Sequence, residues 1–197
     1  MTHLKDEHIE LYTFQSKKEG KSYCGDAFFY FSDETGFFAI VADGLGSGIF
    51  ANESAEAAIE AAKQNRQNDV ETIMKACNQA LLNKRGAAVS VIKIDYVKKE
   101  FTYSSVGNVK FYFLKQDGTI IYPLPVYGYL SGKNQLFITQ TYKYDVPSRF
   151  FIHTDGLHEL ARKKYVKMNI PLSYIYRNLI EIVDNRDDTT FLIGSLH

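Results

Sequence analysis

Strand-forming segments follow one another in runs along this chain, with few helical segments between them. The segments rich in aromatic and β-branched residues, which favour strands, are residues 8–14, 27–31, 37–42, 87–96, 101–106, 110–114, 119–122, 150–154 and 190–193. Two helices are expected between the third and fourth strands, and one more, at 172–183, before the last. Strands in runs rather than in strict alternation with helices predict an α+β fold with mainly antiparallel sheets, whose faces the helices cover.

Different signals predict the two central helices. In residues 51–64 the apolar side chains recur at helical spacing on one face, namely Ala51, Ala55, Ala58, Ile59 and Ala62. Asp69 is a suitable N-cap for the second helix. The apolar face that follows it consists of Val70, Ile73, Cys77, Ala80 and Leu81.

Composition argues against several classes of protein. The 197 residues fit one domain, 1–197. The 23 basic and 23 acidic residues give a formal net charge of +0, whereas proteins that bind nucleic acid through bulk charge carry a basic excess. Cys24 and Cys77 are too few for a disulfide framework or a structural zinc site. No segment approaches the roughly 20 apolar residues of a membrane helix. We expect a soluble, cytoplasmic monomer that binds neither nucleic acid nor membrane.

Aspartates stand at the ends of predicted strands or in the turns beside them. Asp26 opens one strand, Asp43 and Asp155 each follow one, and the pair Asp187-Asp188 precedes the last. Strand ends on one side of a sheet-based fold gather into one cleft, where ionised carboxylates would repel each other. A divalent cation supplies compensating charge, and carboxylate oxygens suit the hard ions Mg²⁺ and Mn²⁺. The pattern therefore predicts a Mg²⁺ or Mn²⁺ site.

Glycine directly follows two of these aspartates, at Gly44 and Gly156. A turn there could require φ > 0, and the lack of a Cβ leaves the backbone carbonyl accessible, so the Gly44 carbonyl is itself a candidate ligand. Asp-Gly is also a common turn dipeptide, and a single one would indicate little. Two of them after hydrophobic strands, together with the other aspartates, favour the metal site.

Other chemistry has weaker support. Residues 44–48 (GLGSG) lack the spacing of a dinucleotide fingerprint and the Lys-Ser/Thr of a P-loop; a flexible turn that lets the next helix pack on the sheet fits better. Cys24 has no obvious His/Asn set to activate it as a nucleophile. His153 is expected to share a face with Asp155, and His158 could reach the cleft as a proton donor. An ordinary structural role is open for both histidines.

Four short runs carry most of these residues: 25–28 (GDAF), 42–48 (ADGLGSG), 153–157 (HTDGL) and 187–190 (DDTT). In order and spacing they resemble the PPM-type, SpoIIE-like family of metal-dependent serine/threonine protein phosphatases. The resemblance extends from about residue 8 to the C-terminus. The turn Gly107-Asn108 is similar to the central Gly-Asp turn of that family, with Asn in place of Asp.

The resemblance implies a four-layer α-β-β-α sandwich of two mainly antiparallel sheets flanked by helices, with the metal site at one end. It also implies that Mn²⁺ or Mg²⁺, as two ions, is held by a set of five ligands, namely Asp26, Asp43, the carbonyl of Gly44, Asp155 and Asp187. Asp43 would bridge both ions, and a metal-activated bridging water would hydrolyse the phosphate ester. Asp188 replaces the usual Asn of the family, which leaves Asp187 and Asp188 as alternatives, with Asp187 favoured.

The chain departs from the family at two positions. Many members carry a histidine soon after the Asp-Gly turn as general acid, where this chain has residues 45–48 (LGSG). Many carry an upstream arginine that grips the phosphate, where this chain offers Lys17, Lys18 and Lys21. The flap segment of larger members is also lacking. Such a site would suit a slow enzyme or one specific for a protein substrate.

Further segments are similar to a stress-response branch of the family, namely 19–22 (EGKS), 52–54 (NES), 83–87 (NKRGA), 105–109 (SVGNV) and 122–125 (YPLP). This resemblance implies that the substrates are phosphorylated STAS-domain proteins of the stressosome, RsbS and RsbR. Their dephosphorylation would act as negative feedback on the sigma-B general stress response. Two alternatives stay open: a non-catalytic phosphatase-like binding or regulatory module, and a phosphatase of small phosphate esters. The complete set of aspartates argues against the first.

Overall fold

Two antiparallel β-sheets form the centre of the computed structural model, which describes residues 2–157 and 168–197. The six-stranded sheet consists, in spatial order, of β1 (Thr2–Lys5), β2 (Ile9–Ser16), β11 (Thr189–Leu196), β10 (Ser148–His153), β7 (Lys110–Leu114) and β8 (Ile120–Ile121). The five-stranded sheet consists of β3 (Asp26–Ser32), β4 (Gly36–Gly44), β5 (Ala87–Asp95), β6 (Glu100–Val106) and β9 (Gln140–Lys143). All neighbouring strands pair antiparallel.

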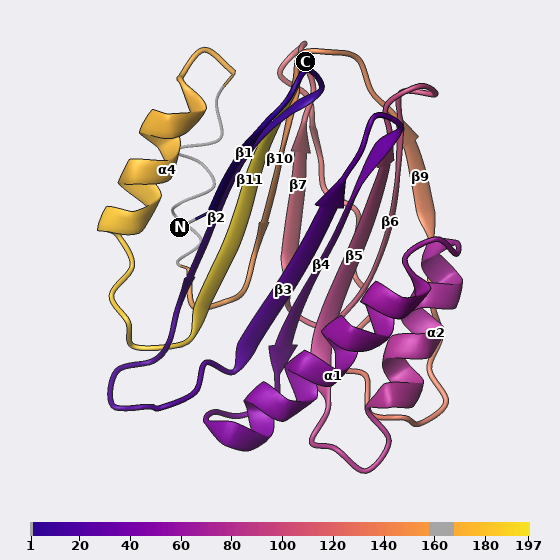
Figure 1. Cartoon of the computed structure of the whole chain (residues 1–197), viewed down its shortest axis with the longest axis vertical. Helices are drawn as coiled ribbons and strands as arrows, with labels where there is room; N and C mark the ends of the chain where they lie inside the picture. The colour runs from indigo at the N-terminus through magenta and orange to yellow at the C-terminus, as the bar shows by residue number, and fades with distance from the viewer. Residues whose placement is uncertain (1, 158–167) are drawn as a thin grey trace.

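Helices cover the outer faces of both sheets. α1 (Ile49–Asn65) and α2 (Val70–Ala80) lie on the five-stranded sheet, and α4 (Leu172–Glu181) lies on the six-stranded sheet (Figure 1). This α-β-β-α layering confirms the α+β class predicted from the order of the strands and helices, and the four-layer sandwich that the family resemblance implies. Within the two described ranges, no helix is long and apolar enough to cross a membrane.

Three apolar clusters fill the interfaces between the layers. The middle cluster lies between the sheets and is rich in aromatic rings: Phe101 of β6 stacks on Phe113 of β7 with ring centroids 4.3 Å apart. Side chains alternate between the two faces of a strand. β6 and β7, which belong to different sheets, therefore each place one set of aromatic rings in the space between the sheets. The two outer clusters hold α1 and α2 on one sheet and α4 on the other.

The central helices follow their sequence signals closely. Every residue expected on the inner face of α1 is buried. Asp69 caps α2, because its side chain accepts a hydrogen bond of 2.9 Å from the backbone N–H of Thr72. One detail of the predicted α2 face was wrong: Ala80 is only partly buried, whereas Met74 is fully buried. Met74 lies four residues after Val70, on the stripe that faces the sheet.

The sequence did not predict β1 and β9. Both are short edge strands, with the sequences THLK and QTYK, and each pairs with one neighbour only. An edge strand needs no continuous apolar pattern, and polar residues there protect the sheet from pairing with other chains. Their sequences therefore carry little of the signal that identifies the inner strands.

The cap of α2 gives a direct test of the fold. Replacing Asp69 with Ala removes the acceptor of the Thr72 N–H, so we expect the free energy of unfolding to fall by about 1 kcal/mol. Urea denaturation measures this change. Asp69→Asn, which keeps an oxygen acceptor, is the matched control and should lose clearly less; equal losses would contradict the capping role.

Candidate active site

Strand ends from both sheets meet at one end of the sandwich. β3 begins there at Asp26 and β4 reaches Asp43 there, and these two residues are partners in the antiparallel register. Such partners have Cβ atoms about 4.5–5.5 Å apart on the same face of a sheet. From the other sheet, β10 ends two residues before Asp155, and β11 begins two residues after Asp187. The structure thus gathers the aspartates that the sequence singled out.

The gathered carboxylates disfavour one another's ionisation. Burial raises the pKa of Asp43 to about 8, and the charges of neighbouring aspartates add to the effect, namely those of Asp26, Asp155, Asp187 and Asp188. Burial also raises the pKa of Asp26 to about 7, even though hydrogen bonds to its carboxylate act in the opposite direction. A cation placed among these groups would therefore be favourable.

Two threonines hold Asp26: Thr154, directly after β10, and Thr190 in β11. The hydroxyl of Thr154 donates a hydrogen bond of 2.7 Å to Oδ2 of Asp26, and the side chain of Thr190 also hydrogen-bonds this carboxylate. The backbone N–H of Thr190 in turn donates to Oγ1 of Thr154 at 2.9 Å, which leaves the hydroxyl proton for Asp26. Sequence reasoning missed both roles, although each threonine lies within three residues of a predicted ligand.

Asp155 is exposed and has an amide partner. Nδ2 of Asn108 donates to its Oδ2 at 2.7 Å, across the turn where the chain passes from β6 in one sheet to β7 in the other. This is the turn where the family pattern has an aspartate. An amide at this position orients Asp155 without adding another negative charge.

Asp187 and Asp188 differ in their surroundings. Asp188 is only 6% exposed, and its Oδ1 accepts a hydrogen bond of 2.9 Å from the backbone N–H of Lys18. A Cβ on Gly25 would lie 2.8 Å from its Oδ2, so the start of β3 packs directly on this carboxylate. The side chain of Asp187 is 54% exposed, and its Oδ1 lies 3.6 Å from Nζ of Lys18. Asp188 is thus part of the packed interior, while Asp187 remains accessible.

The glycines after Asp43 and Asp155 allow close backbone approach. Neither Gly44 nor Gly156 has a positive φ, so the expectation of a left-handed turn was wrong. A Cβ on Gly44 would overlap the carbonyl oxygen of Ala51 in the first turn of α1, and one on Gly156 would overlap the carbonyl oxygen of Asp188. Glycine at position 44 therefore lets α1 pack on the end of β4, as the sequence suggested for the 44–48 turn.

The remaining candidate groups are less central. His153 is buried in β10, where its Nδ1 lies 2.8 Å from the carbonyl oxygen of Thr154 and its ring packs on Phe151, which supports the structural role. His158 lies outside the described residues. Burial raises the pKa of Cys24 to about 12, with the charge of Asp26 adding to it. The protonated thiol agrees with the exclusion of Cys24 as a nucleophile.

The donors at this end of the sandwich fit a hard divalent cation. They are carboxylate and carbonyl oxygens, and the raised pKa of Asp26 and Asp43 indicates a deficit of positive charge. Within residues 2–157 and 168–197, no group of three or more acidic, histidine or cysteine side chains is arranged to hold an ion as it stands. The ligand set predicted from the sequence stays a prediction.

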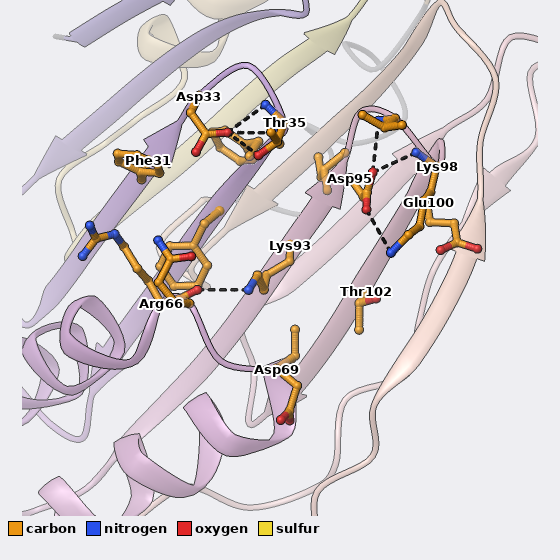
Figure 2. A pocket seen from close by; sticks show the side chains of 17 residues that line it. Phe31, Asp33, Thr35, Arg66, Asp69, Lys93, Asp95, Lys98, Glu100 and Thr102 are labelled. Atoms are coloured by element: carbon orange, nitrogen blue, oxygen red, sulfur yellow. Dashed lines mark hydrogen bonds and ion pairs between the residues drawn. The ribbon is translucent and has the colours of Figure 1, made fainter.

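A cavity of about 430 Å³ lies at the opposite end of the β3–β4 hairpin (Figure 2). Its wall includes Phe31, five residues along β3 from Asp26 and thus about 17 Å away. The charged groups there serve local structure: Nζ of Lys93 donates to the carbonyl oxygen of Arg66 at 3.0 Å, and Asp33 accepts from Thr35 at 2.8 Å. The cavity is therefore separate from the aspartate cluster.

Replacing Asp43 with Asn should stabilise the metal-free fold. With a raised folded-state pKa, Asp43 binds more protons in the folded than in the unfolded protein between about pH 4 and 8, so wild-type stability falls as pH rises through this window. In EDTA at pH 8 we expect the variant to melt about 2–4 °C higher, and the gain to shrink at pH 5. Asp33→Asn, in an exposed turn at the other end, should not show this gain. A lower melting temperature for Asp43→Asn at pH 8 would contradict the repulsion.

Replacing Thr154 with Val should weaken metal binding. The variant removes the hydroxyl that orients Asp26 and favours its charged form, so we expect the Mg²⁺ concentration for half-maximal thermal stabilisation to rise roughly tenfold. Thr154→Ser keeps the hydroxyl and should retain wild-type affinity. If serine and valine behave alike, the hydroxyl has no such role.

Comparisons with known proteins agree with this fold and with the family resemblance. The family model for stage II sporulation protein E (SpoIIE) matches residues 33–195. Phosphoserine phosphatase RsbX from Bacillus subtilis (strain 168) is 44% identical over 193 residues, which cover 98% of this chain and 97% of that protein. A crystal structure of RsbX in complex with magnesium has a TM-score of 0.95 at 43% identity and covers 100% of this chain and 99% of that chain.

A chain from a structural study of the bacterial stressosome, described as a modular system adapted to control secondary messenger signalling, has a TM-score of 0.84 at 28% identity. It covers 95% of this chain and 98% of that chain. Together with the family match, these relatives confirm the resemblance inferred from the sequence. The chain therefore belongs to the SpoIIE family of PPM-type (PP2C-type) phosphatases.

Proposed function

We propose that this phosphatase removes phosphate from serine and threonine residues of the STAS-domain stressosome proteins RsbS and RsbR. It would act in the cytoplasm as a monomer and provide negative feedback on the sigma-B general stress response. The observation that carries the proposal is the 44% identity to RsbX over nearly the whole of both proteins, which is joined by the structural similarity to a chain from the stressosome study.

We further propose that Mg²⁺ or Mn²⁺, as two ions, is held by Asp26, Asp43, the carbonyl of Gly44, Asp155 and Asp187. Three observations support this set: the register pairing of Asp26 with Asp43, their raised pKa, and the magnesium in the related RsbX crystal. When bound, such ions supply an activated water nucleophile and stabilise negative charge on the phosphoryl oxygens.

The protein's own residues position this ligand set. Thr154 and Thr190 fix the carboxylate of Asp26, and Asn108 orients that of Asp155. Asp188 binds the backbone of Lys18, whose ammonium group then lies beside Asp187. Asp187 is the accessible member of its pair, which favours it over Asp188 as the ligand.

Phosphate release from phosphorylated RsbS and RsbR tests the proposal. We expect hydrolysis that requires Mg²⁺ or Mn²⁺ and is abolished by EDTA. Asp43→Ala should reduce the rate to background because it removes the proposed bridging ligand, whereas Asp33→Ala, at the far end of the same hairpin, should keep the wild-type rate.

Other outcomes would favour the alternatives. No metal-dependent hydrolysis of any phosphoester would indicate a binding module without activity. Faster turnover of p-nitrophenyl phosphate than of the phosphorylated STAS proteins would indicate a phosphatase of small esters. Full activity of Asp43→Ala would exclude the proposed ligand set.

A further inference from the structure

A continuous series of contacts runs along one side of the aspartate site. It starts at Asp155, which accepts a hydrogen bond from Asn108. The neighbouring Gly107 lies against the segment that follows β8: its N–H donates to the carbonyl oxygen of Val126 at 2.9 Å, and a Cβ on it would lie 3.2 Å from the carbonyl oxygen of Gly128. The loop around Tyr127 is thereby fixed beside the site.

The line continues to the turn after Asp43. A Cβ on Gly86 would lie 2.8 Å from Cδ2 of Tyr129, so this ring packs on the residue next to Arg85. A Cβ on Gly46 would in turn lie 2.9 Å from Nη1 of Arg85. The N–H of Leu45 donates to the carbonyl oxygen of Gly86 at 3.0 Å, which fixes the two loops together.

Large side chains on this line are exposed to solvent. Phe50, in the first turn of α1, is 56% exposed, Tyr129 is 46% exposed and Tyr127 is 99% exposed. The guanidinium of Arg85 lies over the ring of Phe50, 5.0 Å from its centroid. We call these four residues, Phe50, Arg85, Tyr127 and Tyr129, the rim. Exposed tyrosine and arginine side chains grouped in this way are typical of residues that dominate protein–protein binding.

Arg85 carries a positive charge beside the turn that follows Asp43. Among the described residues, no carboxylate forms a salt bridge with it, whereas Nζ of Lys18 lies 3.6 Å from Oδ1 of Asp187. The adjacent aspartates make the site itself acidic. A guanidinium beside that site can attract an acidic partner and pair with one of its carboxylates through two parallel hydrogen bonds.

We propose that the rim is a docking surface for the folded phosphoprotein substrate, with Arg85 pairing with a carboxylate beside the phosphorylated residue and the three rings covering apolar surface around it. This inference rests on the proposed function, since it concerns the substrate of the same site. A folded protein that presents a phosphorylated side chain to the aspartates must also contact the loops that surround them. A small ester reaches the aspartates without touching the rim.

Comparing a protein substrate with a small ester distinguishes an effect on substrate docking from an effect on the chemical step. We would measure kcat/KM with Mg²⁺ on a phosphorylated STAS protein and on p-nitrophenyl phosphate. For Arg85→Glu and Tyr127→Ala we expect about 10- to 100-fold lower kcat/KM on the phosphoprotein, mainly through KM, and less than a twofold change on the small ester. Arg85→Lys keeps the charge but not the planar fork and should recover part of the loss.

Matched control variants lie on α4, which covers the opposite sheet. Arg177→Glu and Tyr174→Ala change an exposed arginine and an exposed tyrosine there and should leave both substrates unaffected. Unchanged turnover of the phosphoprotein by the rim variants would overturn the inference. Equal losses on both substrates would also overturn it, because Arg85 would then act on the phosphoryl group itself. If wild-type enzyme does not hydrolyse the phosphoprotein at all, the proposed function fails instead.

Discussion

The repulsion between Asp26 and Asp43 is the constraint around which this end of the molecule is organised. The two residues are register partners on adjacent strands, so the separation of their Cβ atoms is fixed by the backbone pairing of β3 with β4. The fold tolerates the pair because the pKa of each carboxyl group is raised, which favours the uncharged form. In addition, hydrogen-bond donors from the side of the second sheet stabilise Asp26. Each sheet thus depends on the other to hold the aspartates together.

Glycines make this convergence sterically possible. A side chain on Gly44 would collide with α1, and one on Gly25 or Gly156 would collide with the segment around Asp188. Gly44 and Gly156 thus mark places beside Asp43 and Asp155 where two backbones come unusually close, whereas Gly25 makes room beside Asp26 for the side chains of Asp188 and Ala51. This explains why Asp-Gly and Gly-Asp recur around the site without any left-handed turn at positions 44 and 156.

The inner strands and central helices could be predicted from sequence because their signals are local. Alternating or clustered apolar residues identified the inner strands, and the alanine stripe of α1 needs only the helical repeat. The edge strands β1 and β9 could not be found, since their sequences, THLK and QTYK, are mostly polar and carry little apolar pattern. For the site, the aspartates were recognisable from their place at strand ends. Thr154 and Asn108 act on carboxylates that lie 128 and 47 residues away in the chain, and only the packing of the two sheets brings them together.

The turn Gly107-Asn108 has a consequence for how the molecule unfolds. It carries the chain from one sheet to the other beside the candidate ligands, and those ligands come from both sides: Asp26, Asp43 and the Gly44 carbonyl from the five-stranded sheet, and Asp155 and Asp187 from the segments next to β10 and β11. Ions held by this set would act as a cross-link across the seam between the sheets. Separation of the two sheets would then require release of the ions, so metal occupancy would govern the unfolding rate of the enzyme as well as its chemistry.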